Sequence, residues 1–185
     1  MATEVLADAE ERMRKTLDAV EREMTSIRTG RARTGLVDQI KADYYGAPTP
    51  LSQLATITAP EPRLIVIQPW DRHAVGAIEK AILKADLGLN PVSDGTLIRL
   101  PIPQLSEERR REMVKLVHKR AEDGRVAIRN VRRDAADKLR DMEKSKDISE
   151  DEHKRLLEQL QGLTGLFVDE VDSLSKAKEA ELLEV

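Results

Sequence analysis

The amino-acid sequence predicts a mixed α+β fold with two domains: a long three-helix bundle built from both ends of the chain, and an inserted α+β domain. Two observations lead to this prediction. All eight prolines lie between Pro48 and Pro103, so both flanks are free to form long helices, from whose interiors proline is excluded. Apolar residues recur at spacings of three and four in both flanks, whereas the middle holds short apolar runs bounded by turn residues.

The N-terminal flank predicts a helix from about residue 2 to Thr29. Gly30 is expected to close it at the C′ position, because glycine readily adopts a positive φ, and nearby arginines would complement the helix dipole. Three arginines within six residues exceed what such a cap needs, so a polyanion contact and a structural role both remain open. The apolar stripe consists of Leu6, Met13, Leu17, Val20, Met24 and Ile27.

The middle of the chain, residues 31–103, predicts the inserted domain. Asp71 is expected to cap a helix that ends near Leu87 and Gly88. Turns are expected at 46–50, 90–91 and 94–95. The chain crosses between domains at about 29–31 and 103–105, where we expect a hinge. Strands are expected at Leu36–Tyr45, Ala55–Thr58, Leu64–Ile67 and Thr96–Leu100.

The C-terminal flank predicts two more helices, from Ser106 to about Lys144 and from Ser149 onward. Gly124 falls on the apolar stripe of the first, where a small residue would allow close approach of another helix. In the second, Gly162 and Gly165 should each cost about 1 kcal/mol relative to alanine. The two stripes are Met113, Val117, Ala121, Ile128, Val131, Ala135, Leu139 and Met142, and Leu156, Leu160, Leu163, Phe167, Val171 and Leu174. Because no helix can bury its stripe alone, the three are expected to form one bundle.

Composition narrows the class of protein. The chain has 185 residues, a net charge of −3 and no cysteine, which excludes disulfides, thiolate metal sites and thiol catalysis. Its beginning lacks the order of a secretory signal, and no apolar run approaches membrane-spanning length. We therefore expect a soluble, cytoplasmic protein, and a monomer because the bundle can close on itself.

Charge is unevenly distributed along the chain. Ten lysines and arginines face five acidic residues between Glu107 and Arg133, whereas thirteen acidic residues face six basic ones from Asp141 on. A helical step of 100° per residue places a row of arginines beside the apolar stripe of the second helix. Such a row could follow an RNA backbone, or it could be a solvated face paired with Asp134, Asp137 or Asp141. The row consists of Arg125, Arg129, Arg132, Arg133 and Arg140.

Enzyme chemistry finds little support in the sequence. His73, His118 and His153 are far apart and lack metal-ligand spacing, so we expect surface or partly buried histidines and no metal site. Phosphate-binding glycine loops and the nucleophile motif Gly-x-Ser-x-Gly are absent. Tyr44 and Tyr45 lie either in a contact loop or at a half-buried strand end.

Several motifs together resemble the ribosome recycling factor family, and they follow the family's order over the whole chain. The motifs are Ser26-Ile27-Arg28-Thr29-Gly30-Arg31-Ala32, Asp43-Tyr44-Tyr45-Gly46-Ala47-Pro48-Thr49-Pro50-Leu51 with Gln53-Leu54-Ala55, Asp86-Leu87-Gly88-Leu89-Asn90-Pro91, Leu105 to Arg111, Arg129-Asn130-Val131-Arg132-Arg133 and Lys178-Glu179-Ala180-Glu181-Leu182.

This resemblance implies an L-shaped molecule: residues 1–30 and 104–185 form the three-helix bundle, and residues 31–103 form a β/α/β sandwich. It implies a factor that binds the ribosome after translation termination and, with elongation factor G and GTP, splits it into subunits so that mRNA and tRNA leave. The factor itself is no enzyme and needs no cofactor, since GTP is used by elongation factor G. Its partners would be the ribosome and elongation factor G, without a membrane.

Residue roles follow from the resemblance position by position. It implies that Arg28, Arg31, Arg129 and Arg132 contact large-subunit ribosomal RNA at the subunit interface, with Arg110 and Arg133 as supporting contacts. It assigns Thr29, Gly30, Gln104 and Leu105 to the elbow. The chain departs from the family pattern at Thr34, where many members carry proline, and at Gly162 and Gly165, where helix formers are usual.

Three alternatives remain open at this stage. One is a helical scaffold that binds another protein and does not contact RNA. A second is an enzyme with a site around Asp43, Tyr44 and Asp94. The third is a family member that silences or stores ribosomes instead of splitting them.

Overall fold

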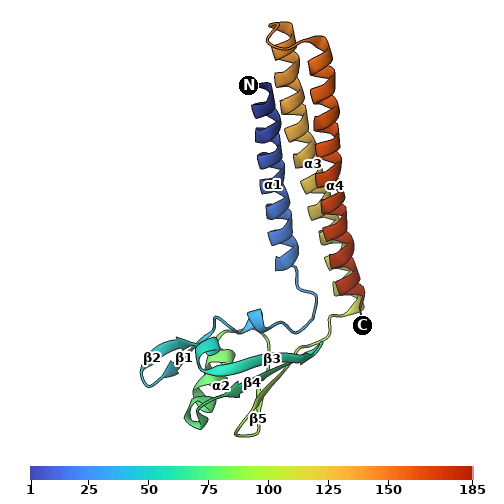
Figure 1. Cartoon of the computed structure of the whole chain (residues 1–185). Helices are drawn as coiled ribbons and strands as arrows, with labels where there is room; N and C mark the ends of the chain where they lie inside the picture. The colour runs from blue at the N-terminus through green and yellow to red at the C-terminus, as the bar shows by residue number, and fades with distance from the viewer. Residues whose placement is uncertain (185) are drawn as a thin grey trace. The chain divides into compact units, whose positions relative to one another are not determined.

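The computed structural model describes residues 1–184 and divides the chain into two compact units (Figure 1). Unit 1 comprises Met1–Thr29 and the chain from Glu107 on, and unit 2 comprises Gly30–Ser106. Both units contain their own buried core, so each is described separately.

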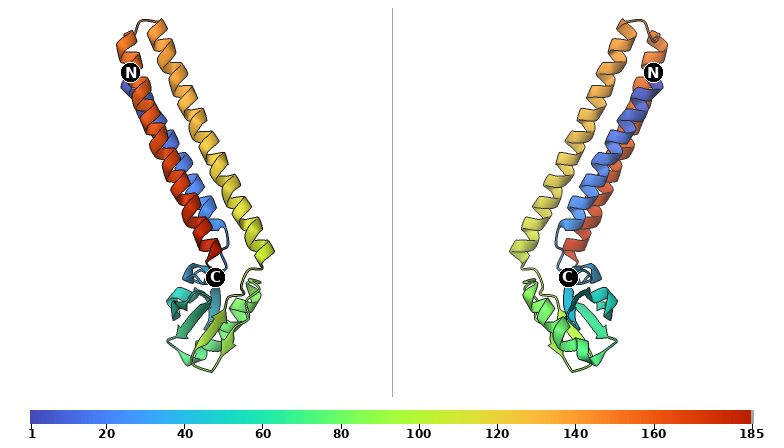
Figure 2. Two further views of the ribbon diagram at one scale, coloured as in Figure 1. Left: turned by 90° about the vertical axis from the view of Figure 1, so that its right-hand side faces the viewer. Right: turned by 90° about the vertical axis from the view of Figure 1, so that its left-hand side faces the viewer.

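Unit 1 is a bundle of three long helices, α1 (Ala2–Ser26), α3 (Glu107–Lys144) and α4 (Glu150–Leu183). Each helix packs against both others, and α3 and α4 extend beyond the shorter α1 (Figure 2). The predicted apolar stripes of the first two helices supply the core, with Met13, Ile128 and Leu139 almost completely buried. Ser149 caps α4 as predicted, because its hydroxyl accepts a hydrogen bond from the Glu152 amide at 3.1 Å.

Gly124 of α3 lies directly against Val20 of α1. A Cβ atom at this position would stand 2.5 Å from Cγ2 of Val20, closer than packed carbon atoms can come. The prediction of a close helix contact at Gly124 is therefore confirmed.

The first helix ends three residues earlier than predicted. The Ser26 hydroxyl donates to the Glu23 carbonyl at 2.7 Å, and the Ile27 amide turns to the Met24 carbonyl, so the next α-helical turn is not formed. Gly30 has the expected positive φ of 73° but lies beyond the helix end and not at its C′ position. The last turn of α1 contains no basic residue, so the predicted dipole role of the arginines is wrong.

In α4 the buried stripe drifts away from the predicted one. Thr164, Ser175 and Lys178 are buried, whereas Leu163 and Leu174 are only partly covered. Thr164 tolerates burial because its hydroxyl donates to the Leu160 carbonyl at 2.8 Å. The helix continues through Gly162 and Gly165, and a Cβ atom at either glycine would meet no other atom within 4 Å.

Unit 2 contains two antiparallel sheets and one helix. The larger sheet has the strand order β3-β4-β6-β5, from β3 (Ala55–Glu61), β4 (Leu64–Pro69), β6 (Ile98–Pro101) and β5 (Val92–Ser93). Helix α2 (Val75–Lys84) contributes Ile78 and Ile82 to a core that also holds Ile65 and Ile67 of β4. The alternation of buried and more exposed residues along β4 and β6 fits sheet faces that differ in burial.

The smaller sheet corrects two expectations. Its first strand, β1 (Lys41–Tyr44), starts five residues later than predicted, because Thr34–Leu36 forms a 3₁₀ turn whose Thr34 carbonyl accepts two amides. The reversal falls at Tyr45 and Gly46, which both have positive φ, and the prolines expected in the turn lie in β2 (Ala47–Pro50). Because β2 pairs with β1 alone, its other edge has no ladder that proline would interrupt.

Two aspartates stabilise the loops of unit 2. Asp71 accepts hydrogen bonds from the His73 amide and the Tyr44 hydroxyl, both at 2.9 Å, and together these lower the pKa of its carboxyl group. Asp94 accepts from the amides of Leu97 and Thr96 and from the Thr96 hydroxyl, which lowers its pKa to about 2. The turn predicted at Asp94 is thus confirmed. Asp71 caps the 3₁₀ turn Arg72–Ala74 that leads into α2 and not α2 itself, and α2 ends at Lys84, before the predicted end near Leu87 and Gly88.

Candidate nucleic-acid interface

The three bundle helices differ in charge. Helix α3 carries thirteen lysines and arginines against nine acidic residues, whereas α1 carries four against seven and α4 four against nine. Ion pairs join α3 to α1 through Arg12 and Asp134 at 3.0 Å, and to α4 through Arg125 and Asp172 at 2.6 Å. Helix α3 therefore concentrates the positive charge of the bundle.

The arginine row lies on the side of α3 that faces α4. Measured from Ile128 in steps of about 100°, Arg132 and Arg125 stand near 40° and 60°, and Arg129 and Arg133 near 100° and 140°. Contacts of Arg132 with Gln161 and of Arg125 with Asp172 place α4 on this side. The row thus runs beside the core, as the sequence pattern predicted, and the structure places it next to the seam between α3 and α4.

Arg125 belongs to the bundle's own structure. Only 22% of its side chain is exposed, and it bonds both Glu122 at 3.0 Å and Asp172 at 2.6 Å. Burial alone would lower the pKa of this guanidinium, but the hydrogen bonds and charges of the two carboxylates outweigh it and raise the pKa. Arg125 therefore has a structural role, but it is not on the solvated face that was expected, and its partners are Glu122 and Asp172 instead of Asp134, Asp137 or Asp141.

Three arginines of the row remain available to a ligand: Arg129, Arg132 and Arg133. Arg129 has a distant partner, Glu122 at 3.9 Å, and Arg132 donates to the neutral Gln161 amide at 3.4 Å. Within residues 1–184, the exposed Arg133 forms no ion pair or hydrogen bond. We call these three residues the arginine surface. Guanidinium groups in such a line can bind phosphates bidentately and stack on bases.

The last member of the row, Arg140, is neutralised. Arg140 pairs with Asp137 at 3.4 Å, as the solvated-face reading expected, whereas Asp134 pairs with Arg12 of α1. Only part of the predicted row therefore has guanidinium groups available to bind an external anion.

Arg110 and Arg28 are separated from the arginine surface along the bundle. Nineteen residues separate Arg110 from Arg129, which is about 28 Å of helix. Arg110 also falls in line with Ile128, on the core side of α3, and is half-buried. Arg28 is exposed just after the end of α1, whose Glu23 pairs with Arg120 of α3. Arg31 is half-buried in unit 2.

Two residues assigned to the elbow contact each other within unit 2. A Cβ atom on Gly30 would lie 3.2 Å from Cγ of Leu105, which brings the two chain crossings together. The positive φ of Gly30 and this tight contact both favour glycine at the position. Thr29 is half-buried and Gln104 is exposed.

The residues proposed for an enzyme or metal site make structural contacts instead. Tyr44 bonds Asp71 and is half-buried, whereas Tyr45 at the turn is 78% exposed. The carboxylate oxygens of Asp94 accept hydrogen bonds from its own turn and from Arg99, the latter at 3.4 Å. His118 contacts Glu179 at 3.0 Å, and His153 contacts Glu143. Within residues 1–184, no group of three or more His, Cys, Asp or Glu residues could hold a metal ion, and no helix could span a membrane.

These observations define a class: an α+β protein in which a discontinuous three-helix bundle carries a basic surface along one helix. The family model described as "Ribosome recycling factor" matches residues 20–183. This match covers most of the chain, and a curated relative is 53% identical over the whole length of both chains. The chain therefore belongs to the ribosome recycling factor family.

Relatives and solved structures agree with this assignment. The ribosome-recycling factors of Carboxydothermus hydrogenoformans and Bacillus subtilis strain 168 are each 53% identical to this chain, and the former match covers 100% of both chains. The solution structure of a ribosome recycling factor is 48% identical, with a TM-score of 0.74 and coverage of 100% of this chain and 98% of that one. A model of the T. thermophilus factor, with E. coli elongation factor G on the E. coli post-termination complex, is 46% identical with a TM-score of 0.64, and covers 100% of both chains.

Proposed function

We propose that this protein recycles ribosomes in the cytoplasm. It binds the ribosome after translation termination and, together with elongation factor G and GTP, splits it into subunits, so that mRNA and tRNA are released. The observation that carries the proposal is the 53% identity with ribosome-recycling factors over the whole of both chains. The chain catalyses no reaction and needs no cofactor of its own, because the GTP is used by elongation factor G.

Within this function, the arginines would anchor the bundle on large-subunit ribosomal RNA. Arg129 and Arg132 would make the principal contacts from α3, with Arg133 beside them and Arg110 in support. Arg28 and Arg31 would contribute near the chain crossings. The charge surplus of α3 and the weak intramolecular partners of the arginine surface support this assignment.

The action would be mechanical. Thr29, Gly30, Gln104 and Leu105 would form an elbow between the units. With the bundle docked on RNA, elongation factor G would push on the hinged factor, and the bundle would displace RNA contacts that bridge the subunits. The long continuous α3 and its close contact with α1 at Gly124 support a bundle stiff enough to transmit force.

Light scattering by post-termination ribosomes tests the proposal. Scattering should fall only when this protein, elongation factor G and GTP are all present, because separated subunits scatter less than intact ribosomes. If ribosome binding occurs without splitting in the presence of a matched elongation factor G, the silencing or storing function is favoured. A protein that does not bind ribosomes at all would contradict the recycling function.

A further inference from the structure

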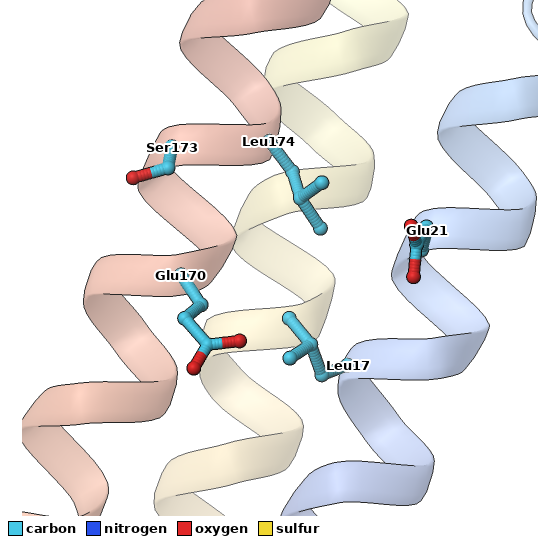
Figure 3. A pocket seen from close by; sticks show the side chains of 5 residues that line it. All are labelled: Leu17, Glu21, Glu170, Ser173 and Leu174. Atoms are coloured by element: carbon cyan, nitrogen blue, oxygen red, sulfur yellow. The ribbon is translucent and has the colours of Figure 1, made fainter.

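A shallow apolar groove lies between α1 and α4, and the arginine surface does not include any of its residues. Its volume is about 310 Å³, and it is lined by Leu17, Glu21, Glu170, Ser173 and Leu174. Figure 3 shows the side chains of Leu17 and Leu174 extending toward each other between the two helices, with Glu170 reaching over from α4. Leu166, one turn before Glu170, is 64% exposed and extends the apolar surface of α4.

The two glutamates of the groove have no cation of their own. Neither Glu21 nor Glu170 forms an ion pair with a side chain in residues 1–184. The nearby Arg14 is already engaged, since it bonds Glu10 at 3.3 Å and lies over the Phe167 ring at 5.4 Å. A partner that enters the groove therefore meets an apolar floor between two unpaired carboxylates on opposing helices.

Charge distinguishes the possible occupants. Both helices that form the groove carry a surplus of acidic residues, so a phosphate backbone would be repelled here. A lysine or arginine side chain fits both properties, because its aliphatic stem can cover leucines while its charged head reaches carboxylates. The groove is thus complementary to a basic protein segment and not to RNA.

We propose that the groove between α1 and α4 docks a protein segment rich in lysine or arginine. The aliphatic stem of one of its basic side chains would lie between Leu17 and Leu174. The bundle would then hold RNA through the arginine surface and a basic protein through this groove. Because the partner is expected on the ribosome, where proteins that bind RNA are basic, the inference rests on the proposed function.

Site-specific photocrosslinking on intact ribosomes tests this inference. The full-length chain receives a benzoylphenylalanine at Ser173, on the rim of the groove, or at the exposed Asn130 of α3 as a control. The Ser173 probe should crosslink to a protein segment rich in lysine and arginine, identified by mass spectrometry, and the Asn130 probe to RNA. E21Q/E170Q should lower the protein crosslink roughly fivefold, since two rim charges are lost. E4Q/E158Q removes the same charge elsewhere and should not change it.

Each remaining outcome overturns the inference. RNA at the Ser173 probe would mean that the carboxylates do not exclude phosphate, and a second copy of this chain there would make the groove a dimer contact. RNA at Asn130 with no protein at Ser173 would refute the groove alone and leave the proposed function standing. No crosslink at either position would refute both.

Discussion

At the scale of single residues, the environment of each α3 arginine decides whether it stabilises the bundle or serves a ligand. Arg125 is 22% exposed between two carboxylates, whereas Arg133 is exposed and Arg132 has a neutral partner. Sequence spacing alone put all of them in one row. The distinction needed the position of Asp172, which lies 47 residues away and on another helix.

Alanine replacements should therefore change different properties: ribosome binding for Arg132 and Arg133, and folding stability for Arg125. Arg132→Ala or Arg133→Ala should leave the free energy of unfolding within about 0.5 kcal/mol of the parent, but should weaken ribosome binding. The slope of log affinity against log salt should fall by about 1 for each lost phosphate contact. Binding measured over a salt series checks this, and an unchanged slope would contradict the RNA contact.

Arg125→Ala serves as the matched control. It should lower the free energy of unfolding by about 1 kcal/mol, because the paired Asp172 loses its partner. Urea denaturation measures this change. A larger effect on the salt slope than that of Arg132→Ala would show that the division between structural and binding arginines is wrong.

Gly124→Ala should strain the bundle. The new Cβ atom would stand 2.5 Å from Val20, so α1 and α3 must separate, and overpacking of this kind costs about 1 to 3 kcal/mol. Urea denaturation followed by helix circular dichroism gives the loss. Adding Val20→Ala should make the double variant more stable than the sum of the two single losses, and simple additivity would argue against the contact.

At the scale of elements, long periodic segments were predictable and their ends were not. The stripes of α1 and α3 followed directly from apolar spacing, because each helix buries one face over many turns. The end of α1 depended instead on the Ser26 hydroxyl, and the late start of β1 on the turn that begins at Thr34. Such local hydrogen bonds compete with regular structure on nearly equal terms, so periodicity does not reveal them.

The buried stripe of α4 and the groove between α1 and α4 show a second limit. Thr164, Ser175 and Lys178 are buried polar residues that no apolar pattern identifies. The groove between α1 and α4 was missed for a related reason, since it arises from partial exposure of Leu174 on one helix next to Leu17 on another. Neither feature exists until two helices meet.

The glycines of α4 allow a test of this element alone. Gly162→Ala and Gly165→Ala should each raise the free energy of unfolding by up to about 1 kcal/mol, because alanine favours helix and its Cβ atom meets nothing within 4 Å. Urea denaturation of the single and double variants measures the gain. A loss of stability would mean that the helix is not regular at these positions.

At the scale of the whole molecule, the two units carry different spectroscopic probes. The only tryptophan, Trp70, lies in unit 2, whereas the long helices of unit 1 dominate the helical circular dichroism. Unfolding of each unit can therefore be followed in the intact chain.

Acid should act on unit 2 through Asp94. Its pKa is about 2 in the folded protein and higher in the unfolded chain, so its stabilising contribution is complete above the unfolded value. That contribution should be lost as the pH falls from about 4 toward 2. Urea denaturation followed by Trp70 fluorescence at several pH values checks this. Asp94→Asn should reduce the pH dependence in this window, and an unchanged dependence would assign it to other carboxylates.

The order of segments in the bundle also has a consequence during synthesis. Helix α1 emerges first, but α3 and α4, which cover its apolar stripe, follow only after the whole of residues 30–106. The core of unit 2 consists of its own residues, so unit 2 can fold before α3 and α4 are made. During that time Met13 and Val20 of α1 remain exposed. Nascent α1 is thus the segment most in need of protection, and the bundle, with its arginine surface, is the last part of the protein to form.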